Sequence, residues 1–243
     1  MCLIAHTLKV KKLIIVMMVG TLLISSLTGY GQTSSIVGSV NQQKTESKEV
    51  VREMNRLQAE VMNTFIKNHQ LKDLQNFWTK DFDGKNPLQE LRKTAIDKLI
   101  TIKVQEELFK EHNLWPYVNY EALLKDMQEV NVTRDKMVQE NKVIYGPVIF
   151  SERTFFDYQF SNAIIKVKAN LKKSVFDVSD KALLLHLEKM KKGIFANNKE
   201  SFDDLRSRIE TSYIDQEYDK LIQQKRNTAI VKINYDVINQ IEF

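Results

Sequence analysis

The sequence predicts a mainly helical protein, and three observations lead to that fold class. After residue 31 the chain has only four glycines and three prolines, fewer than a β-sandwich, a barrel or a phosphate-loop enzyme would need. Apolar residues recur at steps of three and four over long stretches. Residues that favour helix N-termini stand just before several of these stretches, namely Asn86, Ser151, Ser179 and Ser201.

The first 31 residues have the layout of a secretory signal. Lys9, Lys11 and Lys12 precede an apolar run from Leu13 to Leu27, and Gly29-Tyr30-Gly31 then offers a small-x-small cleavage site. We therefore predict a signal peptide or an N-terminal membrane anchor over residues 1–31, with cleavage after Gly31 favoured. The anchor is the alternative, although the apolar run is shorter than the roughly 20 residues that a full membrane span requires.

Charge and cysteine content also depend on this segment. Without it the formal net charge falls from +5 to +2, because the segment holds three lysines and no acid. No nucleic-acid partner is expected, since such a partner needs a concentrated basic face. The single cysteine, Cys2, also lies there, so the remaining chain can form no disulfide. Export without cysteines is typical of a Gram-positive-like cell surface or another extracytoplasmic setting, membrane-associated or secreted. The membrane is expected as a partner only through residues 1–31.

Residues 32–46 are predicted to be a linker with a short strand, and residues 47–243 a helical domain. A first helix is predicted from Ser47 to His69, where apolar residues follow steps of three and four. The stretch from Leu71 to Trp78 is predicted to form a short helical turn. A loop is expected around Asp83 and Gly84.

The clearest helix start lies at Asn86. Asn86 can cap the helix, Pro87 suits its first position, and Gln89 can reach back to the cap. The apolar stripe then continues through Phe109, and Trp115-Pro116 ends the helical pattern. A third helix is predicted from about Tyr120 to Glu140.

The second half of the chain continues the helical pattern with two extended stretches. Val143 to Phe150, which contains Gly146-Pro147, is predicted to be extended. Helices are predicted after Ser151, after Ser179 (ending at Gly193) and after Ser201 (through Leu221). Ala229 to Asn234 is predicted to form a strand, and a last turn is expected near Val237 to Ile241.

The sequence contains no recognisable catalytic or metal-binding pattern. The histidines are far apart, and none forms a short-range pair with another metal ligand on a shared helix face. No nucleophile elbow, phosphate-binding loop or dinucleotide fingerprint occurs. The acid pairs Asp81/Asp83 and Asp203/Asp204 are better explained as a loop and a helix first turn than as a glycosidase pair. We therefore predict no catalytic residue, no metal and no cofactor.

Aromatic residues cluster at three places, and they are the candidate ligand-binding residues. One cluster precedes the helix that starts at Asn86, another follows it, and a third opens the helix after Ser151. Aromatics on more than one helix face are either buried on several sides or line a groove. Core packing is the more common explanation. The candidate peptide-binding residues are Phe77, Trp78, Phe82, Trp115, Tyr120, Phe155, Phe156 and Phe160.

Several motifs resemble SurA/PrsA-type extracytoplasmic foldases, a family with a SurA N-terminal-like chaperone domain and peptidyl-prolyl isomerase-like members. The resemblance covers most of the chain from Val40 onward and consists of packing and turn residues. Its main motifs are Phe77-Trp78-Thr79, Asp83-Gly84-Lys85-Asn86-Pro87-Leu88, Val143-Ile144-Tyr145-Gly146-Pro147, Phe155-Phe156-Asp157-Tyr158 and Val231-Lys232-Ile233-Asn234.

Two departures from the family limit what the resemblance implies. The family's Val-Asn-Gly is replaced here by Val40-Asn41-Gln42, which lacks the glycine. A parvulin isomerase domain, which is rich in glycine, cannot fit in a chain with four glycines after residue 31. The resemblance therefore implies a SurA-N-like chaperone domain without isomerase chemistry. It also implies that the strand from Ile36 to Asn41 pairs with Ala229 to Asn234, and that the helix after Ser201 packs on the N-terminal helices.

The function expected from these observations is an extracytoplasmic chaperone or foldase-like protein. It would bind unfolded or extended apolar segments of exported polypeptides in clefts between helices, without catalysis. The alternatives are a peptidyl-prolyl cis-trans isomerase, a dedicated helper of a single exported client, and a helical spacer tethered to the membrane. A homodimer is possible, because relatives of this type can dimerise. The sequence itself shows no heptad repeat long enough to predict a coiled-coil interface.

Overall fold

A computed structural model describes residues 35–191 and 200–242 of the chain. These residues form seven helices and a three-stranded sheet, which confirms the predicted mainly helical class. The predicted signal segment and the predicted helix end at Gly193 lie outside the described residues. No helix within the described ranges is both long and apolar enough to cross a membrane.

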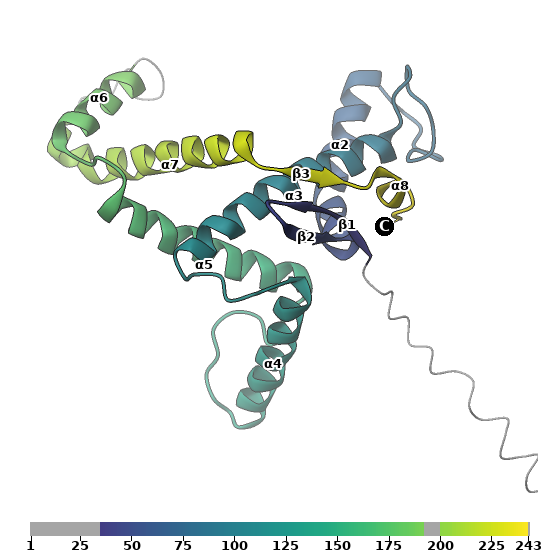
Figure 1. Ribbon diagram of the computed structural model, residues 1–243, viewed down its shortest axis with the longest axis horizontal. Coiled ribbons are helices and arrows are strands. Elements are labelled where there is room, and N and C mark those ends of the chain that lie inside the picture. The colour runs from purple at the N-terminus through teal and green to yellow at the C-terminus, as the bar shows by residue number, and fades with distance from the viewer. Residues whose placement is uncertain (1–34, 192–199, 243) are drawn as a thin grey trace, which may run out of the picture. The chain divides into compact units, whose positions relative to one another are not determined.

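The sheet joins the two ends of the described chain. Strands β1 (Ile36–Val40), β2 (Gln43–Glu46) and β3 (Val231–Ile233) are antiparallel, and β1 lies between the other two (Figure 1). Gly38 of β1 lies opposite Ile233 of β3. A Cβ atom at Gly38 would collide with the Lys232 carbonyl oxygen, so this position requires glycine. The predicted pairing of the N- and C-terminal segments is confirmed.

Strand β2 was not predicted, because its sequence Gln43–Glu46 is polar throughout. It exists because Asn41 and Gln42 form a tight turn that folds it back on β1. Both turn residues have positive φ, 46° and 67°, as a two-residue hairpin of the favoured type requires. The turn is also tied to β3, since Asn41 Oδ1 accepts a hydrogen bond from Ile230 N at 2.8 Å.

Helices α2 (Ser47–His69) and α3 (Pro87–Glu111) form the centre of the fold. Helix α2 has the predicted bounds and begins with a reciprocal capping box between Glu46 and Glu49. Helix α3 begins as predicted, with the Asn86 side chain accepting a hydrogen bond from Gln89 N. Buried residues lie on several sides of α3, which makes it the central helix of the main core.

The segment between α2 and α3 differs from the prediction. Residues 75–79 form turns and residues 71–74 lie in no helix, in place of the predicted helical turn. Phe77 from this segment packs edge-on against Phe65 of α2, with ring centroids 5.9 Å apart. Burying this ring over the end of α2 decides the path of the chain, which local helix propensity cannot predict.

The remaining helices are α4 (Tyr120–Gln139), α5 (Glu152–Ser174), α6 (Asp180–Lys191), α7 (Phe202–Thr228) and the short α8 (Tyr235–Ile238). Ser151 and Ser201 cap α5 and α7 as predicted, and Ser179 Oγ accepts from Ala182 N at the start of α6. Residues 143–150 form no strand.

Helix α7 packs back on α3, as expected. Gln105 Nε2 donates to Tyr218 Oη at 2.9 Å, and Arg226 binds Thr101 and Asp97 of α3. The N-terminal part of α7 has a separate small core with α6, formed by Leu183, Leu187, Leu205 and Ile209.

Candidate functional site

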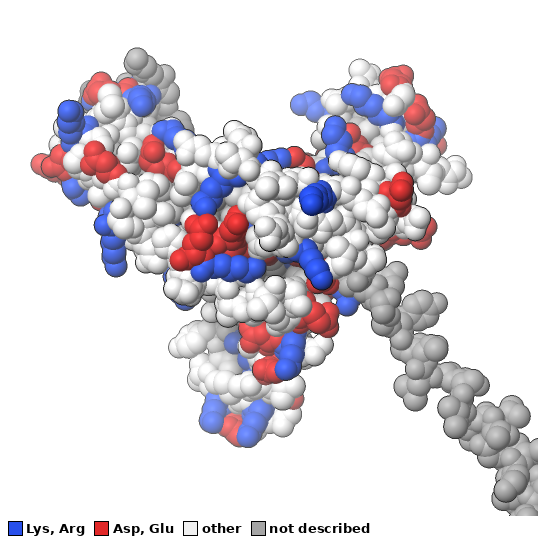
Figure 2. Space-filling view, in the orientation of Figure 1, with Lys and Arg blue, Asp and Glu red and all other residues white. Residues whose placement is uncertain are grey.

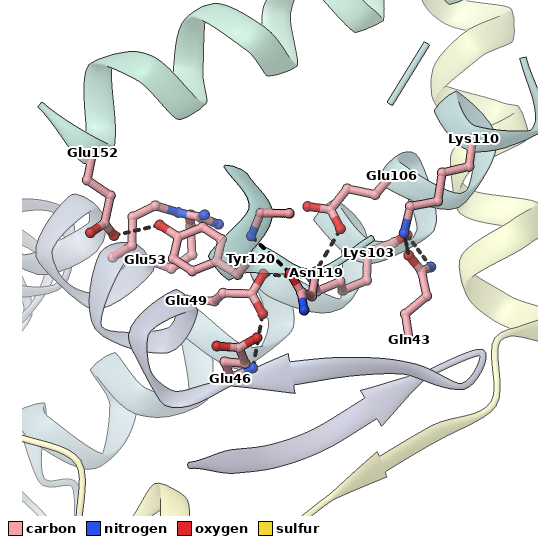
Figure 3. Close-up of polar contacts among 12 residues, drawn as sticks. Gln43, Glu46, Glu49, Glu53, Lys103, Glu106, Lys110, Asn119, Tyr120 and Glu152 are labelled. Atoms are coloured by element: carbon pink, nitrogen blue, oxygen red, sulfur yellow. Dashed lines mark hydrogen bonds and ion pairs between the residues drawn. The ribbon is translucent and has the colours of Figure 1, made fainter. Parts of the chain in front are cut away.

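A cluster of charged side chains is buried between α2 and α3 (Figure 3). Lys103 Nζ lies 2.6 Å from Glu49 Oε1 and 3.1 Å from Glu106 Oε2. Glu49 also accepts from Glu46 N at 3.0 Å, so the carboxylate that caps α2 is the one that holds the lysine of α3. The cluster therefore ties the two central helices together at the base of the hairpin.

Arg52 and Glu53 extend the cluster along α2. Arg52 Nε donates to Glu53 Oε1 at 2.8 Å, and both side chains are buried. The Arg52 guanidinium lies 3.6 Å from the ring centroid of Phe156 and 5.0 Å from that of Tyr120. Its two Nη atoms form no hydrogen bond within the described residues, so the aromatic faces add cation–π contacts to the ion pair with Glu53.

Hydrogen bonds link the cluster to the neighbouring elements. Gln43 of β2 donates to the Lys103 carbonyl oxygen at 3.1 Å and accepts from Lys110 Nζ at 2.7 Å. Tyr120 Oη donates to Glu152 Oε1 at 2.5 Å, which joins α4 to α5. Strand β2 and helices α2 and α3 are thus connected by one set of polar contacts, and α4 and α5 by the separate Tyr120–Glu152 bond, as Figure 3 shows.

The environment of the cluster shifts the pKa values of Glu106 and Lys103, among others. Burial raises the pKa of Glu106 above its ordinary range, although the attraction of Lys103 opposes this. Burial by itself lowers the pKa of Lys103, but Glu106 and Glu49 outweigh it, so the net pKa is raised. A lysine held in its charged form cannot act as a nucleophile. The cluster is therefore suited to a structural role.

A cavity of about 460 Å³ lies beside the cluster. Glu49, Lys103 and Glu106 line it on one side, and residues 41–44 and the segment from Trp115 to Leu123 supply much of the remainder. The cavity could hold a small polar ligand. Its charged groups already pair with one another, so they point to no particular ligand. Within residues 35–191 and 200–242, no group of His, Cys, Asp and Glu side chains could hold a metal ion.

Seven of the eight candidate aromatic residues make ring contacts, six of them in two separate groups and Phe155 with Phe150, while Tyr120 lies against the Arg52 guanidinium. Phe77, Trp78 and Phe82 contact one another or Phe65 near the end of α2. Trp115, Phe156 and Phe160 contact one another and Phe109 of α3, while Phe155 packs on Phe150. The five buried members are Phe77, Trp115, Tyr120, Phe155 and Phe156.

These five side chains form part of the core, and two of them, Trp115 and Tyr120, also line the cavity beside the charged cluster. Trp78, Phe82 and Phe160 are half-buried and pack against the same core. Core packing therefore accounts for the aromatic clusters in the described conformation. Their role in peptide binding stays a prediction.

A different apolar surface is exposed on the connection between α4 and α5, residues 140–151. We call it the loop surface and define it by four exposed side chains: Val143, Tyr145, Val148 and Ile149. The exposed fractions of Val143, Tyr145 and Ile149 are 77%, 88% and 66%. In Figure 2 the loop beside α4 is largely white, which means that Lys, Arg, Asp and Glu are nearly absent from it. Neighbouring apolar side chains exposed in this way are typical of an interaction surface.

Two residues of α4 hold the backbone of this loop. Arg134 Nη2 donates to Tyr145 O at 2.6 Å, and Arg134 Nε donates to Pro147 O at 2.8 Å. Asn131 donates to Phe150 O at 2.9 Å and accepts from Phe150 N at 2.7 Å. Phe150 is buried, and the Arg134 guanidinium lies 5.1 Å from its ring centroid. These contacts therefore hold the loop backbone in the conformation that exposes the four apolar side chains.

Sequence reasoning missed both the charged cluster and the loop surface. One signal was available for the cluster: Lys103 and Glu106 interrupt a stretch of α3 in which Ile102, Val104 and Leu108 are all apolar. Charges inside such a stretch are buried together when the helix is surrounded. For the loop surface, the sequence pattern predicted only that residues 143–150 are extended.

Comparison with protein-family models, with curated proteins and with solved structures finds no match for this chain.

Proposed function

We propose that this protein is an extracytoplasmic, chaperone-like binding protein for unfolded segments of exported polypeptides, and that it works without catalysis. The observation that carries the proposal is the loop surface, where neighbouring large apolar side chains are exposed on a backbone held by Arg134 and Asn131. An apolar surface held open in this way offers a client burial of its own apolar side chains.

The balance of charges around the loop surface supports an uncharged client. Residues 125–153, which include most of α4 and the loop, contain five Lys and Arg and five Asp and Glu. The seven residues from Val143 to Ile149 contain no charge at all. A net charge of zero gives no electrostatic preference for an acidic lipid surface, a nucleic acid or a basic peptide. Apolar contact is therefore the main attraction that the surface offers.

The sequence resemblance to SurA/PrsA-type foldases and the signal-like N-terminus support the same proposal. On this basis the proposed clients are exported polypeptides and the proposed site of action is outside the cytoplasm. A general chaperone and a dedicated helper of one client both fit this surface. A panel of unrelated unfolded clients separates them, since the dedicated helper would bind only one.

The proposal can be tested with residues 32–243, which contain the compact unit from Ser35 to Phe243. Suppression of aggregation of a thermally unfolding reporter at near-stoichiometric ratios is expected, with no acceleration of proline-limited refolding. The double variant Tyr145→Ser/Ile149→Ser should weaken suppression at least about tenfold, because each side chain contributes about 1.5–3 kcal/mol when buried by a client.

The matched control is Ile230→Ser/Val175→Ser, which removes two exposed apolar side chains away from the loop surface. This control should suppress aggregation as well as the unmodified chain. Equal loss in both variants, or no suppression by the unmodified chain, would refute the proposed site. Catalytic acceleration of refolding would show an isomerase instead.

A further inference from the structure

Helix α6 is attached to α7 by a small core of its own. Among the described residues, this core consists of Leu183 and Leu187 of α6 with Leu205 and Ile209 of α7, and it is separate from the main core. A contact with so few buried apolar side chains opens more readily than the main core. The 12 residues of α6 are also too few to stay helical in water without packing contacts, so release of α6 from α7 also unfolds it.

His186 of α6 is buried in this contact, and only 5% of its surface is exposed. Its Nε2 atom lies 3.1 Å from Ser212 Oγ of α7, and its ring packs edge-on against Tyr213, with ring centroids 5.5 Å apart. The Ser212 hydroxyl can donate or accept, so this hydrogen bond forms in either protonation state of the imidazole. Histidine is the side chain whose charge normally changes between pH 5 and pH 8. The α6–α7 contact therefore contains a group that titrates near physiological pH.

The surroundings of His186 favour its neutral form. Burial disfavours the charged imidazolium, and the ammonium groups of Lys189 and Lys220 repel it, whereas the Glu217 carboxylate attracts it. Glu217 is already paired with Lys220, their Oε1 and Nζ atoms being 2.6 Å apart. Asp177, in the segment before α6, accepts a hydrogen bond from the backbone just before that helix. The net result is that the pKa of His186 lies below its ordinary value.

We propose that the α6–α7 contact is an acid-sensitive switch, in which protonation of His186 releases α6 and exposes the four apolar side chains of the shared core. This inference goes beyond the proposed function and does not depend on it. The released state binds the proton more tightly than the packed state, because release returns the imidazole to water. The contact is therefore complete above about pH 6.5, the ordinary pKa of histidine, and weakens as pH falls through the folded-state pKa.

Amide hydrogen exchange of residues 32–243 between pH 7.5 and pH 5.5 tests this proposal, with each rate corrected for the intrinsic pH dependence of exchange. The protection of the α6 amides should fall at least about threefold relative to that of the α3 amides. His186→Gln cannot be protonated in this range and can still bond to Ser212, so it should remove this change. His112→Gln, at the end of α3, is the matched control and should behave as the unmodified chain does.

A second pair of variants decides the matter if α6 of His186→Gln is unprotected at every pH. Lys189→Gln removes a repelling charge and should make the fall in α6 protection smaller. Lys181→Gln, which removes an exposed lysine from the first turn of the same helix, should leave it unchanged.

Three outcomes would overturn the switch. The first is an equal fall in α6 protection in a folded His186→Gln variant. The second is a fall that affects α6 and α3 to the same extent, which indicates global unfolding. The third is a titration of the His186 ring, followed by nuclear magnetic resonance, at or above its ordinary pKa of about 6.5. Suppression of aggregation at pH 7.5 reports on the loop surface alone, so its presence or absence leaves this test unaffected.

Discussion

Lys103 of α3 and Glu49 of α2 form an ion pair across the centre of the protein, with Lys103 Nζ and Glu49 Oε1 2.6 Å apart and both side chains buried. The pair joins α2, which starts directly after the hairpin, to α3, the central helix of the main core. Buried ion pairs contribute little net stability compared with apolar replacements, but removal of one partner leaves a buried charge.

Substitution Lys103→Met should therefore destabilise the protein by about 3–5 kcal/mol, because Glu49 and Glu106 both lose their cation. The measurement is urea unfolding followed by circular dichroism. Lys125→Met is the matched control, since Lys125 is 76% exposed and forms its ion pair among the described residues with Glu129 on its own helix. Its effect should stay below about 0.5 kcal/mol. Similar losses in both variants would contradict the role assigned to the buried lysine.

Substitution Glu106→Gln should raise stability at neutral pH and should have the least effect at acid pH. Burial raises the pKa of Glu106, so its contribution is largest below its ordinary pKa and is lost as pH rises through the folded-state pKa. Glutamine resembles the protonated form and can still accept from Lys103. Unfolding midpoints measured between pH 4 and pH 8 test this. A variant that is equally destabilised at every pH would show that the Glu106 charge is needed.

Stability should fall steeply above about pH 10, near the ordinary pKa of tyrosine and lysine. Burial raises the pKa of Tyr218 to about 12, and burial also raises the pKa of Tyr117 and Tyr120. The net pKa of Lys103 is raised as well. The folded chain then holds protons that the unfolded chain releases, so stability is complete below pH 10 and declines as pH rises.

The absorbance of ionised tyrosine at alkaline pH, recorded together with circular dichroism, measures this behaviour. Ionisation of the buried tyrosines should coincide with loss of helix. Tyr145→Phe is a control, because Tyr145 is 88% exposed and its hydroxyl can be removed without disturbing the core, so the pH of unfolding should stay the same. Tyrosines that all titrate while the helices remain folded would contradict the prediction.

Substitution Gln42→Gly should stabilise the protein by about 0.5–1 kcal/mol, because a non-glycine residue at φ 67° is strained. Asn-Gly is also the preferred pair for this type of hairpin turn. Thermal unfolding measures the effect. Lys44→Gly, on an exposed position of β2 in the same hairpin, should instead destabilise, since glycine weakens a strand. A loss of stability in Gln42→Gly would mean that the glutamine side chain contributes more than the strain costs.

Local chemistry explains which parts of the fold were predictable. Asn86, Ser151 and Ser201 accept hydrogen bonds from residues three positions ahead, so a helix start can be recognised within four residues. The pairing of β1 with β3 was expected from the family resemblance, and the glycine at position 38 allows the close approach. The turns between Leu71 and Trp78 were missed, because burial of Phe77 against Phe65 overrides local propensity.

The sequence by itself determined the helical class and the helix starts, since each depends on neighbours within a few positions. Only the tertiary structure decided which aromatic and charged side chains are buried. Phe156 lies in the core over Arg52, while Tyr145 is exposed, although both are aromatic residues in apolar stretches. The reason is that burial depends on contacts between residues far apart in the chain. The spacing of apolar residues along one helix does not show which other helices or strands will pack against that helix.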